Sequence, residues 1–341
     1  MVNQALPEPR EHMANALATF INRLASCSVT RRAPIIDRSG RYDQGRRPYT
    51  LQPVLLSRVA VMLIRFFNLL SRCPLWLLQL GGSALGVGIW LGSPRHRRQL
   101  RENAGRVGLS RYQRWLAILH TGRMVAELPR LWLGEPMPFE WSGVDLLHAA
   151  VQRQDRICLL TPHMGCFEMC AQGYAQTFAH PALGDAAKPI TVLYRPSRQA
   201  TLQQLVHRGR ERSGMFAAPA TLSGVKQLIK ALKGAQTVGL LPDQVPPDGM
   251  GVWAPFLGQP AYTMTLAGRL AREADTVLMM WGERLPWGRG FRLHVAKPVG
   301  VLPADPEGAA AMVNAWVEQT IQACPEQYLW GYDRFKGPRR P

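Results

Sequence analysis

Residues 156–170 read RICLLTPHMGCFEMC, an apolar run that ends at a proline and continues directly into a histidine. Pro162 cannot donate to a central ladder, so the predicted strand ends there. Gly165 permits a tight turn into a helix that is expected to start near Cys166. The spacing therefore predicts that His163 lies at the carboxyl end of a strand, the edge at which open α/β sheets bind ligands.

Apolar runs on either side of this stretch alternate with segments of helical periodicity. The sequence predicts buried strands at 156–161, 190–195, 237–242 and 276–283, and helices at 110–134, 201–213, 222–233 and 261–273. A further strand at 291–299 is expected to be antiparallel, and 309–324 to form a late amphipathic helix. The order predicts an α/β fold with a mixed, largely parallel central sheet flanked by helices.

The composition allows a large core and favours acidic partners. The chain has 341 residues, 47% of them hydrophobic, and a net charge of +18. Such a charge attracts nucleic acid, anionic lipid, phosphorylated substrates or an acidic carrier protein. The sequence shows no zinc-finger spacing, aromatic RNA-binding signature or basic recognition helix, so nucleic acid is not an expected partner.

The six cysteines have no Cys-x-x-Cys pair and no disulfide-framework spacing. They are interpreted as reduced thiols in a chain that faces the cytosol. His163, Cys166 and Cys170 form a weak candidate for a shared metal, because the paired cysteines of metal sites normally stand two residues apart. No metal site is therefore predicted.

Residues 1–58 are rich in proline and contain nine arginines, which predicts a disordered basic extension. An alternative interpretation is that Met62 is the true start of the protein. A single folded α/β domain is expected to cover 93–337, and 338–341 to form a tail.

Residues 59–92 are predicted to form a hydrophobic membrane anchor. Residues 73–92 are about twenty residues without a charge, close to the length that crosses a bilayer. Trp76 and Trp90 suit the headgroup boundary, which is consistent with either a spanning or an interfacial anchor. The larger arginine cluster follows the apolar stretch, so the C-terminal bulk is expected to face the cytoplasm. A buried helical hairpin of a soluble protein is the alternative.

Glu168 follows His163 by five positions, and the pair raises the possibility of acid–base chemistry. In one ideal helix this spacing would put the two side chains on different faces. Across a strand-to-helix turn, however, Glu168 can fold back and fix one imidazole tautomer, which leaves the other nitrogen as a general base for a hydroxyl. Alone, such a pair is more often structural than catalytic.

Four segments in order carry a family resemblance. HMGCFE at 163–168 resembles the His-x4-Asp/Glu box of the glycerolipid and lysophospholipid acyltransferase superfamily, in the form found in bacterial lipid A biosynthesis acyltransferases. YRPSRQATLQQLVHRGRERSG at 194–214, LLPDQVPPDGMGVWAPFLGQPAYT at 240–263 and PEQYLWGYDRFK at 325–336 resemble the later motifs of that family. The similarity spans roughly 62–337. Departures at Cys166, Gln199 and Val245 leave the substrate and acyl chain open.

The resemblance implies that His163 removes the proton from a hydroxyl on a 3-hydroxyacyl chain of a lipid A precursor while that oxygen attacks an acyl thioester. Glu168 is expected to orient the imidazole. The implied donor is acyl carrier protein or acyl-CoA, and no cofactor is implied. The implied location is the inner membrane, with the catalytic domain facing the cytoplasm.

The resemblance also implies a set of substrate-binding residues. Arg195 would bind a phosphate or the carrier's phosphopantetheine, since a guanidinium offers a planar fork of donors. Asp243, with Gln244 as its companion, would position an arginine or the substrate. Glu127 interrupts an apolar helical face and is expected either in a buried ion pair or in a direct role. The remaining candidates are arginines that could equally form a solvated helix face, namely Arg198, Arg208, Arg210 and Arg212, and basic residues of a surface tail, Arg334 and Lys336.

Three other functions stay open on the sequence. The first is acyl transfer to another glycolipid or to a lysophospholipid. The second is thiol-dependent hydrolysis by Cys166 or Cys170 with a histidine. The third is non-catalytic binding of anionic lipid.

Overall fold

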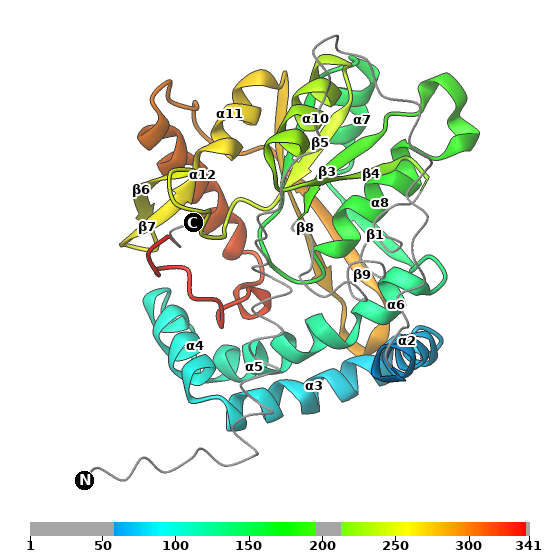
Figure 1. The fold of residues 1–341 in the computed structure, drawn as a ribbon, viewed down its shortest axis with the longest axis vertical. Helices are drawn as coiled ribbons and strands as arrows, with labels where there is room; N and C mark the ends of the chain where they lie inside the picture. Colours follow the sequence, from blue (N-terminus) through cyan, green and yellow to red (C-terminus); the bar gives the residue numbers. More distant parts are fainter. Residues whose placement is uncertain (1–57, 195–212, 339–341) are drawn as a thin grey trace.

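The structure is a computed structural model that describes residues 58–194 and 213–338 (Figure 1). Its centre is a seven-stranded sheet in the order β1-β9-β8-β2-β5-β3-β4. All neighbouring strands are parallel except the β8–β9 pair, which confirms the predicted mixed, largely parallel sheet. The strands are β1 (Phe139–Ser142), β2 (Ile157–Leu160), β3 (Ile190–Tyr194), β4 (Met215–Pro219), β5 (Thr237–Leu240), β8 (Thr276–Arg284) and β9 (Phe291–Ala296).

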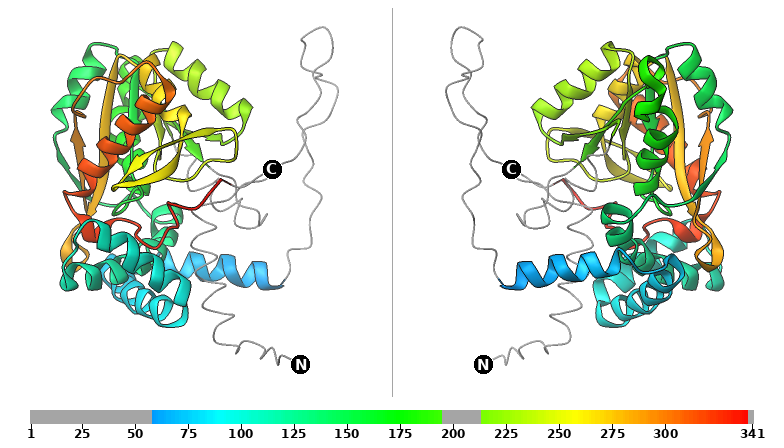
Figure 2. Two further views of the ribbon diagram at one scale, coloured as in Figure 1. Left: turned by 90° about the vertical axis from the view of Figure 1, so that its left-hand side faces the viewer. Right: turned by 90° about the vertical axis from the view of Figure 1, so that its right-hand side faces the viewer.

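Helices cover both faces of this sheet, as the side views show (Figure 2). Strand β2 is buried throughout because its side chains alternate between two apolar cores. Cys158 and Leu160 pack on the side of α10 (Leu222–Lys233), α11 (Thr265–Glu273) and α12 (Pro306–Ile321). Ile157 and Leu159 pack on the side of α7 (Asp145–Gln152) and α8 (Glu168–Phe178). The continuous apolar run of β2 is therefore explained by burial on both faces.

The main departures from the predicted elements lie between 251 and 273. A two-stranded antiparallel sheet of β6 (Gly251–Phe256) and β7 (Gln259–Met264) packs on α12. The helix predicted at 261–273 therefore begins only at Thr265, and the prediction for 261–264 is wrong. Pairing with β6 buries Tyr262 and Thr263, so tertiary contacts override the helical pattern there. Strands β1 and β4 were not predicted.

The N-terminal helices lie across the end of the sheet at which β8 ends (Figure 1). They are α2 (Arg58–Leu70), α3 (Leu75–Gly92), α4 (Pro94–Arg106), α5 (Arg111–Ala126) and α6 (Leu128–Leu133). Within the described residues, α3 is the one helix long and apolar enough to cross a membrane, and 33% of it is buried in the protein. The apolar helix α3 is consistent with the membrane anchor predicted at 59–92. The predicted extension at 1–58 lies outside the described residues, except for Arg58.

Helices α3 and α5 approach each other closely because glycines line their contact. A Cβ atom on Gly86 would collide with the backbone of Ile118, and one on Gly122 would collide with the backbone of Gly82 and Gly86. These glycines lower intrinsic helix propensity, yet here they allow the two backbones to pack together. The carboxyl edge of the sheet is thus covered by a tightly joined helix pair.

Candidate active site

His163 is held by a sharp turn between β2 and α8. Gly165 has a φ of +54°, its N–H donates to the Gln327 carbonyl at 2.9 Å, and a Cβ atom would collide with the Gly282 carbonyl. Only glycine fits this turn without strain. The His163 carbonyl accepts the Leu329 N–H at 3.0 Å, so backbone hydrogen bonds fix the loop on both sides of the imidazole.

The carboxylate that contacts the His163 ring belongs to Asp243. The ring Nδ1 lies 2.6 Å from Asp243 Oδ1, and the His163 backbone N–H donates to Oδ2 at 2.8 Å. Strands β2 and β5 are parallel neighbours that pair Leu160 with Leu240. Each strand is followed three residues later by one member of the pair, so the sheet register brings the two residues together at its carboxyl edge.

The surroundings of Asp243 favour its ionised form. Burial alone would raise its pKa, but the attraction of His163 in its protonated form and the two hydrogen bonds from that residue hold the pKa below its ordinary value. The neighbouring Tyr328 keeps its proton, because burial and the Asp243 carboxylate hold its pKa well above the usual range. An ionised carboxylate only accepts hydrogen bonds, so the imidazole carries its proton on Nδ1.

The other nitrogen of the imidazole faces Gln244. The side-chain nitrogen of Gln244 lies 2.9 Å from His163 Nε2. With the proton on Nδ1, Nε2 has a free lone pair and accepts an N–H of this amide. The His163 side chain is 11% exposed, so the site is nearly closed around a nitrogen that can act as a base.

Glu168 stands in the first turn of α8 and is also buried. Its Oε2 accepts the indole N–H of Trp132 at 3.3 Å. A helix N-terminus favours a negative charge, which stabilises the carboxylate at this position. The orientation of His163 by Glu168 stays a prediction, since the described hydrogen bonds of the ring are with Asp243 and Gln244.

Glu127 forms a buried ion pair. Arg284 Nε donates to its two carboxylate oxygens at 2.9 and 2.7 Å, and Gln79 of α3 donates to Oε1 at 3.0 Å. Arg284 Nη2 also donates to the Gly165 carbonyl at 2.7 Å. The ion pair therefore connects the helix layer to the loop that carries His163. A buried ion pair was one of the two roles expected for Glu127.

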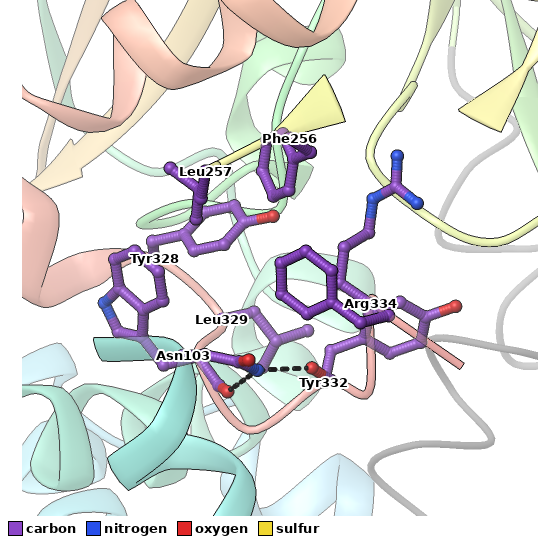
Figure 3. Close-up of a pocket in the computed structure, with 9 residues that line it drawn as sticks. Asn103, Phe256, Leu257, Tyr328, Leu329, Tyr332 and Arg334 are labelled. Atoms are coloured by element: carbon purple, nitrogen blue, oxygen red, sulfur yellow. Dashed lines mark hydrogen bonds between the residues drawn. The ribbon is translucent and has the colours of Figure 1, made fainter. Parts of the chain in front are cut away.

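The C-terminal motif braces the loop that carries Asp243. The Tyr332 hydroxyl accepts the Val245 N–H at 3.0 Å, and Asn103 donates to the carbonyls of Trp330 and Tyr332 at 2.9 and 3.0 Å (Figure 3). Asn103, Trp330 and Tyr332 line a small pocket together with Phe256 and Leu257. Aromatic packing and backbone hydrogen bonds of the C-terminal segment thus hold the loop that carries Asp243 in place.

Arg334 belongs to this group of bracing residues. The expectation that it lies in a surface tail is wrong. It is 2% exposed, donates to the Tyr262 carbonyl and the Thr263 hydroxyl, each at 2.8 Å, and stacks on the ring of Phe256. Burial lowers its pKa, while neighbouring Tyr328 and Asp243 raise it. These contacts assign Arg334 a structural role between β7 and the C-terminal segment.

The predicted arginine sites fall outside the described residues. These are Arg195, Arg198, Arg208, Arg210 and Arg212. Of the remaining candidates, the structure brings His163, Asp243 and Gln244 into one hydrogen-bonded group.

Sequence reasoning missed three residues that support the site, Trp132, Arg284 and Tyr328. Tyr328 lies within the C-terminal motif, where only the basic residues were considered. Trp132 and Arg284 carry no local signal, since their partners are 36 and 157 residues away.

The cysteines near the site are poor nucleophiles. Burial raises the pKa of the Cys158 thiol to about 12, and burial followed by the charge of Glu127 raises that of Cys166 well above its usual range. Burial likewise raises the pKa of Cys170. Since the thiolate is the reactive form, this chemistry disfavours the thiol hydrolase alternative.

A maleimide that blocks accessible thiols is therefore expected to leave the catalytic turnover of the protein unchanged. The measurement is turnover before and after treatment, with mass spectrometry to count the modified cysteines. A matched Cys166→Ser variant should retain turnover, because no thiol is needed. Rapid inactivation with modification confined to Cys166 or Cys170 would support a thiol mechanism instead.

Comparison with known proteins supports a specific family. A family model described as bacterial lipid A biosynthesis acyltransferase matches residues 118–337, more than half of the chain. The lipid A biosynthesis lauroyltransferase of Escherichia coli K12 is 32% identical over 190 residues, which cover 54% of this chain and 58% of that protein. The lipid A biosynthesis palmitoleoyltransferase of the same organism is 30% identical over 202 residues, with coverage of 58% and 61%.

A more distant relative is the lipid A biosynthesis acyltransferase of Haemophilus influenzae, 25% identical over 193 residues, with coverage of 56% and 57%. The chain thus spans about three fifths of the length of the relatives that it matches. The part of this chain that the family model matches contains His163, Glu168, Asp243 and the C-terminal motif.

Proposed function

Because the chain belongs to the bacterial lipid A biosynthesis acyltransferase family, we propose that it transfers a fatty acyl chain from an acyl thioester to a hydroxyl on a 3-hydroxyacyl chain of a lipid A precursor. The observation that carries this proposal is the hydrogen bond between the ionised Asp243 and His163 Nδ1, which leaves Nε2 as a general base. A hydroxyl is too weak an acid to attack unaided at neutral pH, so the reaction needs such a base.

The proposed step forms one bond and breaks one bond. The acceptor oxygen attacks the thioester carbonyl carbon while His163 Nε2 takes the hydroxyl proton. The carbon–sulfur bond then breaks, and the leaving sulfur takes the proton from the imidazolium. Asp243 stabilises the imidazolium that forms between these two transfers, as a buried carboxylate does in other acyl-transfer sites.

Gln244 has to yield for this step to occur. Its amide N–H occupies the Nε2 lone pair at 2.9 Å, the position that the acceptor hydroxyl must take. We infer that the acceptor displaces this amide, which then becomes available to hydrogen-bond the bound substrate. Gln244 would thus contact the substrate, in agreement with its sequence-based assignment.

Replacing Glu168 by glutamine tests its proposed positioning role. The variant is expected to lose about 10-fold or more in turnover, because the imidazolium loses a nearby charge. The loss should lie in kcat with little change in KM, because the proposed role concerns the chemical step.

A matched control for this experiment is Glu140→Gln, which removes an exposed carboxylate from β1. It should leave both kcat and KM unchanged. A folded Glu168→Gln protein with the kcat of the parent protein would contradict the positioning role.

The donor that we propose is acyl carrier protein, with acyl-CoA as the alternative. The net charge of +18 attracts an acidic carrier and speeds encounter with it. Measuring initial rates with each donor at rising salt separates the two. Transfer from the carrier protein should fall much more steeply with salt than transfer from acyl-CoA, because the carrier interface involves more charges.

For the acceptor, we propose a lipid A precursor at the cytoplasmic face of the inner membrane. A different glycolipid or a lysophospholipid is the second candidate for the acceptor. Mass spectrometry of lipid A from cells with and without this protein tests the choice. The proposal requires a species heavier by one acyl chain, and unchanged lipid A in both strains would redirect it to another acceptor.

A further inference from the structure

The helix layer leaves a broad apolar surface uncovered. On α2 the exposed side chains include Met62, Phe66 and Leu69, and on α3 they include Trp76, Leu80 and Leu91. Exposed large apolar side chains on two consecutive helices indicate an interaction site. The question is whether α3 crosses a membrane or lies upon it.

One side of α3 is committed to the protein along its whole length. Its buried residues run from Leu75 to Ile89 and face α5, with the glycine contacts in the middle. At one end Gln79 hydrogen-bonds the buried Glu127. A helix that crossed the bilayer in this packing would take α5 with it, including Arg114 and the partly buried Arg123, which is costly in hydrocarbon.

The turn between β8 and β9 adds a third element to the same surface. In this turn, η2 (Pro286–Gly288) packs on α3, and a Cβ atom on Gly288 would collide with Trp76. Trp287 stands beside this contact with 91% of its surface exposed, and it adopts a left-handed backbone conformation with a φ of +60°. An indole held out at the end of a rigid turn suits the headgroup boundary of a membrane.

These elements lie at the same end of the molecule. Helices α2 and α3 run along one end of the molecule, and the β8–β9 turn reaches that same end (Figures 1 and 2). The charge there is also one-sided, because residues 58–101 contain seven arginines and no acidic residue. Arg65 and Arg72 are exposed within α2 and just after it, and Arg289 is exposed beside Trp287.

We propose that α2, α3 and Trp287 form one docking surface that lies in the plane of an anionic bilayer, with α3 parallel to the membrane and not across it. The apolar side chains enter the interface, and the arginines at the margins contact lipid phosphates. Strand β8 ends at this surface, and β2 runs parallel to β8. The carboxyl end of β2, which His163 follows, therefore points toward the lipid in the docked protein. This inference concerns membrane geometry and does not depend on the proposed reaction.

The first test is the topology of α3. In a full-length Cys27→Ser/Cys73→Ser background, single cysteines are introduced at Arg72 and Arg98, which are exposed on either side of α3. A membrane-impermeant maleimide is then applied to sealed spheroplasts and to inverted inner-membrane vesicles. In-plane docking requires that both positions react from the same side. Labelling from opposite sides shows a spanning helix and overturns the proposal.

The second test measures the contribution of Trp287. Trp287→Asn removes the indole, and asparagine tolerates the left-handed backbone of this turn. Flotation with vesicles of phosphatidylethanolamine and phosphatidylglycerol should show a partition coefficient lower by roughly five- to ten-fold, as expected when one large apolar side chain is lost. Partition equal to that of the parent protein overturns the three-part surface.

Trp253→Asn is the matched control, because Trp253 is also exposed but lies on β6, away from the docking surface. Its vesicle partition should match that of the parent protein. Far-UV circular dichroism checks that both variants keep the parent fold. Concentration-dependent self-association without flotation would show that a second copy covers this face, and it would also overturn the proposal.

Discussion

Replacement of His163 by alanine is expected to lower the proposed acyl transfer by roughly 10²-fold or more, the usual effect of losing a general base. The reason is geometric, because no other described side chain offers a free imidazole nitrogen beside Asp243 at this edge of the sheet. Single-turnover rates with purified protein in micelles measure the effect separately from product release.

The interpretation of this variant depends on an unchanged fold. His163→Ala should keep the melting temperature and membrane association of the parent protein within a small margin, since the ring is at the edge of the core. His180→Ala removes an exposed imidazole from the segment before η1 (Pro181–Ala186) and should retain full turnover. Near-normal turnover of a folded His163→Ala protein would refute the assignment.

The pairing with Asp243 makes a further requirement of the same experiment. If His163 and Asp243 act as one unit, Asp243→Asn lowers turnover strongly, and the double variant is no slower than His163→Ala alone. Such non-additivity is the signature of groups that serve one step. Additive losses would mean that Asp243 contributes independently, for example by holding the loop.

The sequence predicted most of the strands that form this edge but not the contact between its residues. His163 and Asp243 were each expected at the end of a strand, in β2 and β5 respectively. Their contact depends on β2 and β5 being neighbours in the sheet, and strand order is not written in local patterns. The sequence therefore indicated Glu168, which lies in the same motif, as the partner of His163. The residue that contacts the ring is Asp243, which lies 80 residues away.

Local patterns also failed where packing decides the conformation. The β6–β7 hairpin contains prolines at 255 and 260, which normally argue against a strand. Its two strands pair only with each other and rest on α12, so both prolines face edges that need no donor. By contrast, α10 and α12 were predicted because each has a helical pattern that its own tertiary contacts reinforce.

The ion pair between Glu127 and Arg284 is the remaining feature with a large expected effect. Glu127 is fully buried, its carboxylate pairs with Arg284, and the charge of Arg123 acts on the same cluster. Burial and the charges of the two arginines hold the pKa of His120 well below its usual range, so this ring adds no third positive charge. Glu127 therefore supplies the counterion of the buried Arg284 guanidinium.

Glu127→Gln is expected to lower the free energy of unfolding by about 3–5 kcal/mol, because it leaves the Arg284 guanidinium buried without its counterion. The measurement is denaturant-induced unfolding at a constant detergent concentration. Glu140→Gln provides the matched control, since its partner Arg292 is partly exposed and such pairs contribute only about 0–1 kcal/mol. Equal effects of the two changes would show that the buried pair is not a source of stability.

The double variant Glu127→Gln/Arg284→Met separates stability from function. Removing both charges should restore most of the lost stability, because a buried ion pair can be replaced by apolar groups at little cost. Turnover should nevertheless stay about 10-fold below that of the parent protein, because the Gly165 carbonyl loses its Arg284 donor beside His163 and misplaced catalytic groups react slowly. Recovery of both properties would mean that the pair only stabilises the fold. Recovery of stability alone would show that the helix layer, through Gln79 and this pair, positions the loop that carries the base.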